Sequence, residues 1–201
     1  PDDWHVHLRD DSLMQAVIED TAINFARAVV MPNLNPPILN VQDALSYRDR
    51  LVNAIGLLIN KKRNLTAQKN DVKILKRFQP LMTIYLSEDI SHEELEKVSE
   101  TEEIIALKYY PSGATTNSQF GVKDLKNCYG IFEIMTRMGI VLCIHGEVLG
   151  PNIDVFDREK KFIDQHLVPL RKEFPELKIV FEHISSREAV QFILDTSNNL
   201  V

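Results

Sequence analysis

Six short apolar segments recur along the chain, and each is followed by a stretch in which apolar residues return every three or four positions. The segments are 4–8, 28–33, 81–86, 104–110, 140–145 and 178–183. This alternation is typical of a parallel sheet whose strands are joined by crossover helices. Several segments, such as 141–144, are apolar on both faces, which indicates burial beneath helices. The sequence therefore predicts an α/β fold with about six βα units.

Helical spacing predicts helices over four longer stretches, 13–25, 41–59, 122–138 and 156–174. Two further helix starts are predicted from capping boxes. In each box a serine can accept from a first-turn amide, and a glutamate three residues later can reach back. The pairs are Ser91 with Glu94 and Ser185 with Glu188.

A doubly wound sheet and a barrel both satisfy this pattern, but the first apolar segment is not followed by a glycine-rich phosphate loop. That favours a TIM-type (β/α)8 barrel. A complete barrel needs about 250 residues, so 201 residues with six strands form an incomplete one. We expect residues 1–201 to be a single barrel domain whose carboxyl-terminal part is missing, and the chain to be the amino-terminal portion of a longer enzyme.

Residues 60–77 differ in composition from the rest of the chain. Seven of these eighteen residues are Lys or Arg, and Asp71 is their single acid. Charge runs of this kind are usually solvated. The segment is therefore interpreted as a basic insertion that joins a helix to the next strand, on the barrel face opposite the active site.

Charge and hydropathy narrow the possible partners. The net charge is −6, and the chain contains no basic stripe with interleaved aromatic residues, which argues against nucleic acid. No apolar run approaches the roughly 18 residues of a membrane span. Two cysteines are too few for a disulfide framework. We expect a cytoplasmic protein that acts on a small molecule and contacts neither nucleic acid nor membrane.

Histidines stand at the ends of several predicted strands. His5 and His7 are two positions apart, so in a strand both point to the same side. His145 and His183 each end a separate apolar segment, where barrel enzymes place catalytic groups. Lys108 ends another such segment. Buried imidazoles need polar partners, and a shared metal ion would supply one. A lysine ammonium has no lone pair, so it must be modified or deprotonated to join a metal site.

Taken together, the motifs carry a close resemblance to a known family. In order along the chain they are WHVHLRD at 4–10, MPNL at 31–34, LKYYP at 107–111, ATTN at 114–117, IHGE at 144–147 and FEHI at 181–184. This set resembles the dihydroorotases of the single-function bacterial type, in the amidohydrolase superfamily. The resemblance runs nearly from end to end, interrupted mainly by the basic segment. It implies zinc-dependent, reversible cyclisation of N-carbamoyl-L-aspartate to L-dihydroorotate in pyrimidine synthesis.

The resemblance implies two Zn²⁺ ions per subunit. His5 and His7 would hold one ion, and His145 and His183 would hold the other. Lys108, carboxylated by CO2 to a carbamate, would bridge both ions. Carboxylation replaces an ammonium with an anionic oxygen donor, and two neighbouring metals can activate water near neutral pH.

Four further residues would bind substrate if the resemblance holds. Arg9 and Asn33 would bind the substrate carboxylate, because a guanidinium forms a fork-shaped, charge-assisted contact with that group. Thr115 and Thr116 would lie on a loop that closes over the substrate. From the residues alone, Arg9 is more often a surface arginine and Asn33 a turn residue after proline, and the threonines could equally be part of a polar loop.

Two acidic side chains near these motifs are interpreted in more than one way, and one cysteine is interpreted as structural. Glu147 and Glu182 are read either as partners that orient the imidazoles or as solvated carboxylates. Cys143 should face the lumen of the barrel as a small apolar side chain, without nucleophilic chemistry.

The family also uses an aspartate from a later strand as general base, and its motif has no counterpart in these 201 residues. We therefore expect the 201-residue chain alone to be inactive. The resemblance also implies that the full-length enzyme is a homodimer. Two alternatives remain open at this point. One is a cyclic amidohydrolase of the hydantoinase or dihydropyrimidinase kind, and the other is a truncated, non-catalytic barrel that serves as an assembly partner.

Overall fold

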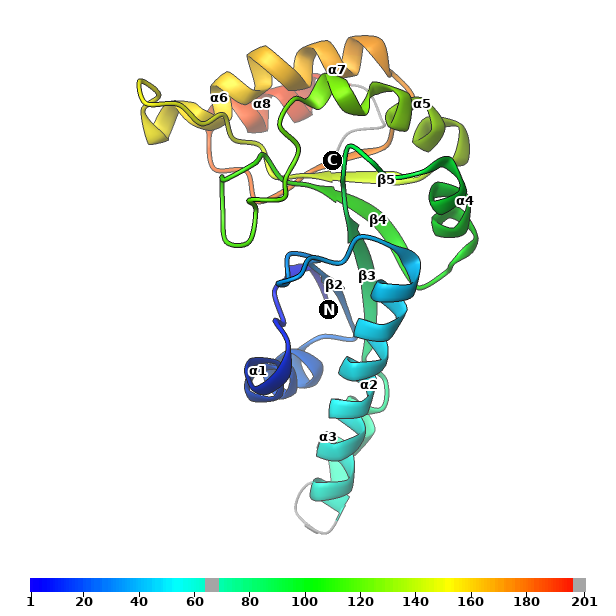
Figure 1. Cartoon of the computed structure of the whole chain (residues 1–201). Coiled ribbons are helices and arrows are strands. Elements are labelled where there is room, and N and C mark those ends of the chain that lie inside the picture. The colour runs from blue at the N-terminus through cyan, green and yellow to red at the C-terminus, as the bar shows by residue number, and fades with distance from the viewer. Residues whose placement is uncertain (64–68, 197–201) are drawn as a thin grey trace.

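Six parallel strands form a curved sheet in the order β1-β2-β3-β4-β5-β6 in a computed structural model, which describes residues 1–63 and 69–196. Each predicted apolar segment overlaps one strand, so the strand prediction is confirmed. The strands are β1 (Asp2–Val6), β2 (Arg27–Val30), β3 (Gln79–Tyr85), β4 (Ile104–Tyr109), β5 (Val141–Ile144) and β6 (Ile179–Phe181). Every neighbouring pair is parallel. The sheet curls, and the helices cover its outer side (Figure 1).

The helices of the described residues fill the gaps between strands. They are α1 (Asp11–Asn24), α2 (Val41–Arg63), α3 (Lys69–Leu75), α4 (His92–Glu100), α5 (Tyr129–Met138), α6 (Arg158–Phe162), α7 (Val168–Glu173) and α8 (Arg187–Asp195). Short 3-10 turns, η2 (Leu125–Cys128) and η3 (Val155–Asp157), precede α5 and α6. A π-helical turn, η4 (Ile163–Leu167), joins α6 to α7.

Two predicted helices are less regular than their spacing indicated. The helix predicted over 122–138 begins later, because Asp124 is extended and its side chain caps η2. The stretch 156–174 is divided among η3, α6, η4 and α7. Pro169 explains the irregularity beside it, since proline lacks an N–H and its ring collides with the carbonyl four residues earlier. The helix accommodates the proline with a wider π turn at that point.

Of the two predicted capping pairs, one is confirmed in its serine cap alone, since Glu94 Oε1 accepts from the N–H of Val41 at 2.6 Å, and the other is wrong by one residue. Ser91 Oγ accepts from the backbone N–H of Glu94 at 3.1 Å and caps α4. At α8 the cap is Ser186, whose Oγ accepts from the N–H of Ala189 at 3.1 Å. Ser185 lies one residue before the cap, and its N–H is bound by Glu159 instead.

The basic segment predicted over 60–77 is largely helical where it is described, and residues 64–68 lie outside the described part. Its beginning is the last turn of α2, and it also contains α3, which leads into the amino-terminal end of β3. Lys62 and Leu75 are buried, so part of the segment packs against its neighbours, whereas the sequence predicted a solvated segment. Lys62 Nζ lies 2.7 Å from Glu19 Oε1 in α1 and 3.1 Å from Asp71 Oδ2 in α3. These contacts tie α1, α2 and α3 together.

The sheet has two buried faces. Toward the helices, side chains such as Leu107, Leu142 and Ile144 belong to the main apolar core. At alternate positions the side chains point to the inner face. Strand register places Lys108 of β4 directly beside Cys143 of β5 on that face. Within the described residues β1 and β6 are the two edges of the sheet. The architecture is an incomplete TIM-type barrel with six βα units, as predicted.

Across the two described ranges, the longest and most apolar helices still fall short of what spanning a bilayer requires.

Candidate active site

Four histidines meet at the carboxyl-terminal ends of β1, β5 and β6, as the sequence predicted. The ring centroids of His5 and His7 are 5.0 Å apart, and those of His5 and His183 are 5.1 Å apart. His145 and His183 are closer still, with centroids 4.7 Å apart. Residues separated by up to 178 positions in the chain are therefore neighbours in space, because parallel strands of a barrel end at the same face.

The hydrogen bonds of His5 and His7 show which ring nitrogen of each carries a hydrogen. Asn33 Nδ2 donates to Thr116 O at 2.8 Å, which leaves Asn33 Oδ1 to accept from His7 Nδ1 at 2.8 Å. His5 Nδ1 lies 3.0 Å from Glu182 Oε1, and an ionised carboxylate only accepts. Both Nδ1 atoms therefore carry a hydrogen. In a neutral imidazole the other nitrogen, Nε2, then holds the lone pair.

The two Nε2 atoms of His5 and His7 face each other across 3.2 Å. Two lone pairs at that distance repel unless a proton or a cation lies between them. Two nitrogens bound to one tetrahedral ion at about 2.0–2.1 Å would be about 3.3 Å apart. The donor chemistry of this pair therefore fits a divalent cation.

His145 presents a third nitrogen without a hydrogen bond. Its Nε2 is buried, and Glu147 Oε1 lies 3.2 Å away without hydrogen-bond geometry. Burial lowers the pKa of His145 to about 4, and it lowers the pKa of His7 to about 4 as well. Both rings are neutral at pH 7, the state in which imidazole can bind a metal.

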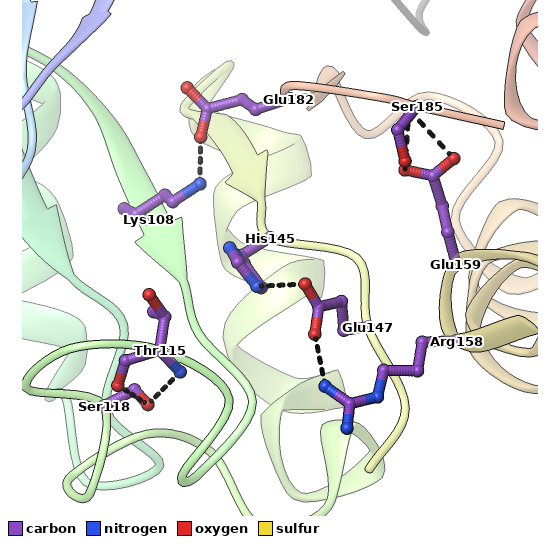
Figure 2. Close-up of polar contacts among 9 residues, drawn as sticks. All are labelled: Lys108, Thr115, Ser118, His145, Glu147, Arg158, Glu159, Glu182 and Ser185. Atoms are coloured by element: carbon purple, nitrogen blue, oxygen red, sulfur yellow. Dashed lines mark hydrogen bonds and ion pairs between the residues drawn. The ribbon is translucent and has the colours of Figure 1, made fainter. Parts of the chain in front are cut away.

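Lys108 and Glu182 form a buried ion pair on the inner face of the sheet (Figure 2). Lys108 has no exposed surface, and burial lowers the pKa of its ammonium against the opposing effect of Glu182. Burial alone would raise the pKa of Glu182, but the hydrogen bond from His5 and the charge of Lys108 hold it below its ordinary value. Glu182 therefore serves as the counter-ion of an unmodified lysine.

In this arrangement the described residues contain no group of three His, Cys, Asp or Glu side chains positioned to hold a metal ion. Glu182 connects His5 with Lys108, so the centre of the histidine cluster is bridged by a carboxylate. A complete metal site would need Lys108 to change its chemical form and its partner. The neutral imidazoles of His7 and His145 nevertheless have the protonation state that such a site requires.

Arg9, which was predicted to bind the substrate carboxylate, has an unsatisfied donor. Its Nη1 atom is buried without a hydrogen-bond partner among the described residues. A buried, unpaired donor is costly, and a carboxylate would satisfy it with a charge-assisted bond. Arg9 lines a cavity of about 360 Å³ together with Leu34, Pro36 and Asn117. Its backbone is left-handed, with φ of 58°, and its carbonyl accepts from the hydroxyl of Tyr47.

The other predicted substrate residues lie nearby but use different groups. Asn33 is buried, and its amide contacts His7 and the backbone of Thr116. The loop of Thr115 and Thr116 is fixed mainly through backbone atoms, since Ser118 Oγ accepts from the N–H of Thr115 at 2.8 Å (Figure 2). Both threonine side chains are exposed. Their hydroxyls are thus accessible to a ligand above the histidines.

Sequence reasoning missed Tyr110 and left Glu182 ambiguous. The Tyr110 hydroxyl is buried without a hydrogen-bond partner among the described residues, and Lys108 Nζ lies 5.1 Å from the centre of its ring. Tyr110 follows Lys108 by two positions in an extended segment, which is a signal that both face the lumen. Glu182 had no such signal, because only the fold brings it to Lys108.

Cys143 agrees with its interpretation as a small apolar side chain. It is buried beside Lys108 on the inner face, and burial raises the pKa of its thiol to about 12. Almost no thiolate exists at neutral pH, so Cys143 is not an effective nucleophile.

Comparisons with known proteins agree with this geometry. A dihydroorotase from Acaryochloris marina is 47% identical over 200 residues, which cover 100% of this chain and 53% of that protein. The crystal structure of dihydroorotase from Campylobacter jejuni has a TM-score of 0.81 at 34% identity, covering 100% of this chain and 52% of that one. Dihydroorotase from Saccharomyces cerevisiae in complex with 5-fluoroorotic acid has a TM-score of 0.79 at 29% identity, with coverage of 99% and 54%.

A more distant structure, L-hydantoinase (dihydropyrimidinase) from Arthrobacter aurescens, has a TM-score of 0.67 at 17% identity, over 96% of this chain and 43% of that one, and shows the shared fold alone. The chain spans about half the length of the curated relatives it matches. The profile of the amidohydrolase family matches residues 3–189. Because that match covers nearly all of the chain, this protein belongs to the amidohydrolase family.

Proposed function

We propose that this chain is the amino-terminal part of a dihydroorotase, which interconverts N-carbamoyl-L-aspartate and L-dihydroorotate. The observation that carries the proposal is the meeting of His5, His7, His145 and His183 with Lys108 at the carboxyl-terminal ends of the strands. The dihydroorotase relatives at 47% and 34% identity support it. Below, the full-length protein means the enzyme of which this chain would form the first half.

In this proposal His5 and His7 would hold one divalent cation, His145 and His183 would hold a second, and carboxylated Lys108 would be a ligand that the two cations share. The facing Nε2 atoms of His5 and His7 and the unpartnered Nε2 of His145 support this assignment. When bound, the cations supply Lewis-acid chemistry to the cyclic amide. Zinc is the metal we propose, although imidazole and carbamate ligands also suit other divalent ions.

Carboxylation of Lys108 explains why the lysine is buried. The neutral amine adds to CO2, a C–N bond forms, and one proton leaves, so that the ammonium is replaced by an anionic carbamate. Burial favours the neutral amine because it lowers the pKa of Lys108. The new negative charge would repel Glu182, so the present ion pair must open. Glu182 would keep its contact with His5, whose Nδ1 lies 3.0 Å from it.

Substrate recognition is assigned to the residues above the histidines. Arg9 would bind the carboxylate of the substrate through its buried, unpartnered Nη1. Asn33 would assist and also hold His7 and the threonine loop in place. Thr115 and Thr116 would contact the substrate through their exposed hydroxyls. The yeast dihydroorotase was solved with 5-fluoroorotic acid, a pyrimidine that bears a carboxylate, which supports an anion-binding role for Arg9.

The test is to measure hydrolysis of L-dihydroorotate and of hydantoin by the full-length protein and its Arg9→Met variant. We expect L-dihydroorotate to be the preferred substrate, and Arg9→Met to lose most of that preference because hydantoin has no carboxylate to bind. Lys97→Met, which changes an exposed lysine of α4, is the control for loss of a positive charge. Preference for hydantoin would identify a hydantoinase, and no turnover of either would favour a non-catalytic barrel.

Location and assembly belong to the same proposal. Cys128 and Cys143 are both buried and free. Buried thiols without a disulfide are consistent with a reducing compartment such as the cytoplasm. We propose a homodimer for the full-length protein, which sedimentation analysis would check. A small-molecule substrate remains the proposed partner, with no contact to nucleic acid or membrane.

A further inference from the structure

The first turn of α6 contacts the segment that follows β6. Glu159 accepts from the N–H of Ser186 at 2.7 Å, and both of its carboxylate oxygens lie 3.1 Å from the N–H of Ser185. The hydroxyl of Ser186 also donates to it, and the hydroxyl of Ser185 lies at 3.5 Å. Figure 2 shows the carboxylate of Glu159 directed at Ser185. One side chain thus satisfies several donors immediately after His183.

The same turn of α6 also contacts the segment that follows β5. Arg158 Nη1 lies 3.5 Å from Glu147 Oε2, and Glu147 Oε1 lies 3.2 Å from His145 Nε2 (Figure 2). The N–H of Val148 donates to the carbonyl of Arg158 at 3.3 Å. Arg158 and Glu159 are adjacent in the chain, yet one reaches toward His145 and the other toward His183. The turn therefore connects the two histidine segments.

His183 needs support from outside its own strand. β6 has three residues and ends at Phe181, so His183 lies beyond the sheet hydrogen bonds of that strand. Its backbone is left-handed, with φ of 43°, a conformation that costs a non-glycine residue free energy. Such a conformation persists only when neighbouring contacts impose it. The contacts that impose this conformation must therefore come from another element, and the hydrogen bonds of Glu159 with the N–H groups of Ser185 and Ser186 meet that requirement.

We propose that Glu159 is a positioning residue that holds His183 at the correct separation from His145 for the two rings to share one divalent cation. The inference rests on the proposed function, because it assigns these two histidines to one metal. Glu159 lies on α6 and reaches the metal only through the backbone that follows His183. No contact between Glu159 and a metal or substrate is part of the proposal.

A purely structural role for Glu159 is the main competing explanation. Ser186 is the N-cap of α8, and in a capping box its N–H would be bound by an acid at the third helical position, which is Ala189 in this chain. Glu159 replaces that acid from another helix. Capping alone does not require the bonds to Ser185, which lies outside the helix and two residues from His183. The two roles predict different effects on metal binding.

The test is Co²⁺ titration of the metal-free full-length protein, followed by visible absorption, with thermal unfolding measured in parallel. In Glu159→Gln we expect one of the two ions to bind about 10- to 100-fold more weakly, with an altered spectrum, as is typical when a residue that orients a ligand is changed. The other ion should bind as in the wild type. Glu188→Gln, which removes an exposed charge from the first turn of α8, should leave both ions unchanged.

Wild-type affinity and spectrum for both ions in Glu159→Gln would overturn the inference. Glu159→Asp is the second variant if the glutamine variant fails to fold, and the same two criteria apply to it. A measurement on the metal-free protein distinguishes failure of this inference from failure of the proposed function. If the wild type binds no Co²⁺, the metal assignment fails, and histidine NMR of the metal-free protein then decides. A shifted or broadened His183 signal in Glu159→Gln, with His7 unchanged, supports positioning, and an unchanged His183 signal contradicts it.

Discussion

The neutral imidazoles of the site make the metal-free protein sensitive to acid. Burial lowers the pKa of His145 and of His7 to about 4 from an ordinary value of 6.5. Between these values the unfolded chain binds more protons than the folded one, so the free energy of unfolding falls as the pH falls from 6.5 toward 4. The loss for the buried His145 is up to about 3 kcal/mol. Urea unfolding of the metal-free full-length protein at pH 7 and pH 5 measures it.

His145→Asn should weaken this pH dependence, because one of the two buried groups that resist protonation is removed. His92→Asn is the matched control, since His92 is exposed on α4 and should leave the dependence as in the wild type. An identical pH dependence in His145→Asn and the wild type would contradict the assignment.

The Lys108–Glu182 pair offers a second test at the scale of residues. Lys108→Met leaves a buried carboxylate without its counter-ion, and this should lower the free energy of unfolding of the metal-free protein by about 3–5 kcal/mol. Adding Glu182→Met should recover much of the loss, because no uncompensated charge then remains. A double-mutant cycle in urea measures the coupling. Additive costs of the two single changes would show that the side chains do not interact.

Much of the site was predictable from the sequence at the level of single residues. The spacing of His5 and His7 and the positions of His145, His183 and Lys108 at strand ends follow from the alternation of a strand and from barrel topology. The hydrogen-bond and ion-pair partners of these side chains could not be predicted in the same way. They depend on which distant strand ends meet, and on side-chain directions that no local pattern records.

Glu182, Glu159 and Tyr110 illustrate that limit. Glu182 pairs with a lysine 74 positions away, and Glu159 binds backbone groups 26 and 27 positions away. Such contacts decide whether an acidic side chain is exposed or buried. The residue type alone does not distinguish the two cases. Tyr110 was closer to being predictable, because it follows Lys108 on the same side of an extended segment.

At the scale of elements, the cap of α8 gives a matched pair of substitutions. Ser186→Ala should lower the free energy of unfolding by about 1–2 kcal/mol, because it removes the acceptor for the N–H of Ala189. Ser185→Ala should lower the free energy of unfolding by only a few tenths of a kcal/mol, since the Ser185 hydroxyl lies 3.5 Å from Glu159 and caps no helix. Urea unfolding of both variants of the full-length protein compares them. A larger loss of stability for Ser185→Ala would show that Ser185 is the cap, as the sequence pattern predicted.

Strands were predicted better than helices and caps, for physical reasons. A strand buried on both faces leaves a continuous apolar run, and six such runs were found as six strands. Two adjacent serines, Ser185 and Ser186, have equal capping propensity, and the choice is made by Glu159 from another helix. The stretch 156–174 has helical spacing throughout, yet Pro169 breaks its hydrogen bonding locally.

At the scale of the whole molecule, the described residues leave apolar surface beside an open sheet. Leu194 and Val190 on α8 are 74% and 47% exposed, and Trp4 on β1 is 61% exposed. The strands β1 and β6 are sheet edges in the described part of the chain. Edges with unpaired backbone groups and exposed apolar side chains promote association between copies. The proposed second half of the enzyme would pair these edges and cover this surface.

We therefore predict that the 201-residue chain expressed alone associates with itself and does not turn over L-dihydroorotate. Co-expression with a separate polypeptide that carries the remainder of the full-length protein should yield a defined complex with measurable turnover, because the missing strands then pair with β1 and β6. Light scattering after size exclusion and the dihydroorotate assay measure both results. Leu194→Lys in the chain alone should reduce association, since a charge disfavours apolar contacts, whereas Lys160→Gln on the exposed surface of α6 should not. A chain that is monomeric at high concentration and unfolds cooperatively would show that six βα units suffice for a stable fold.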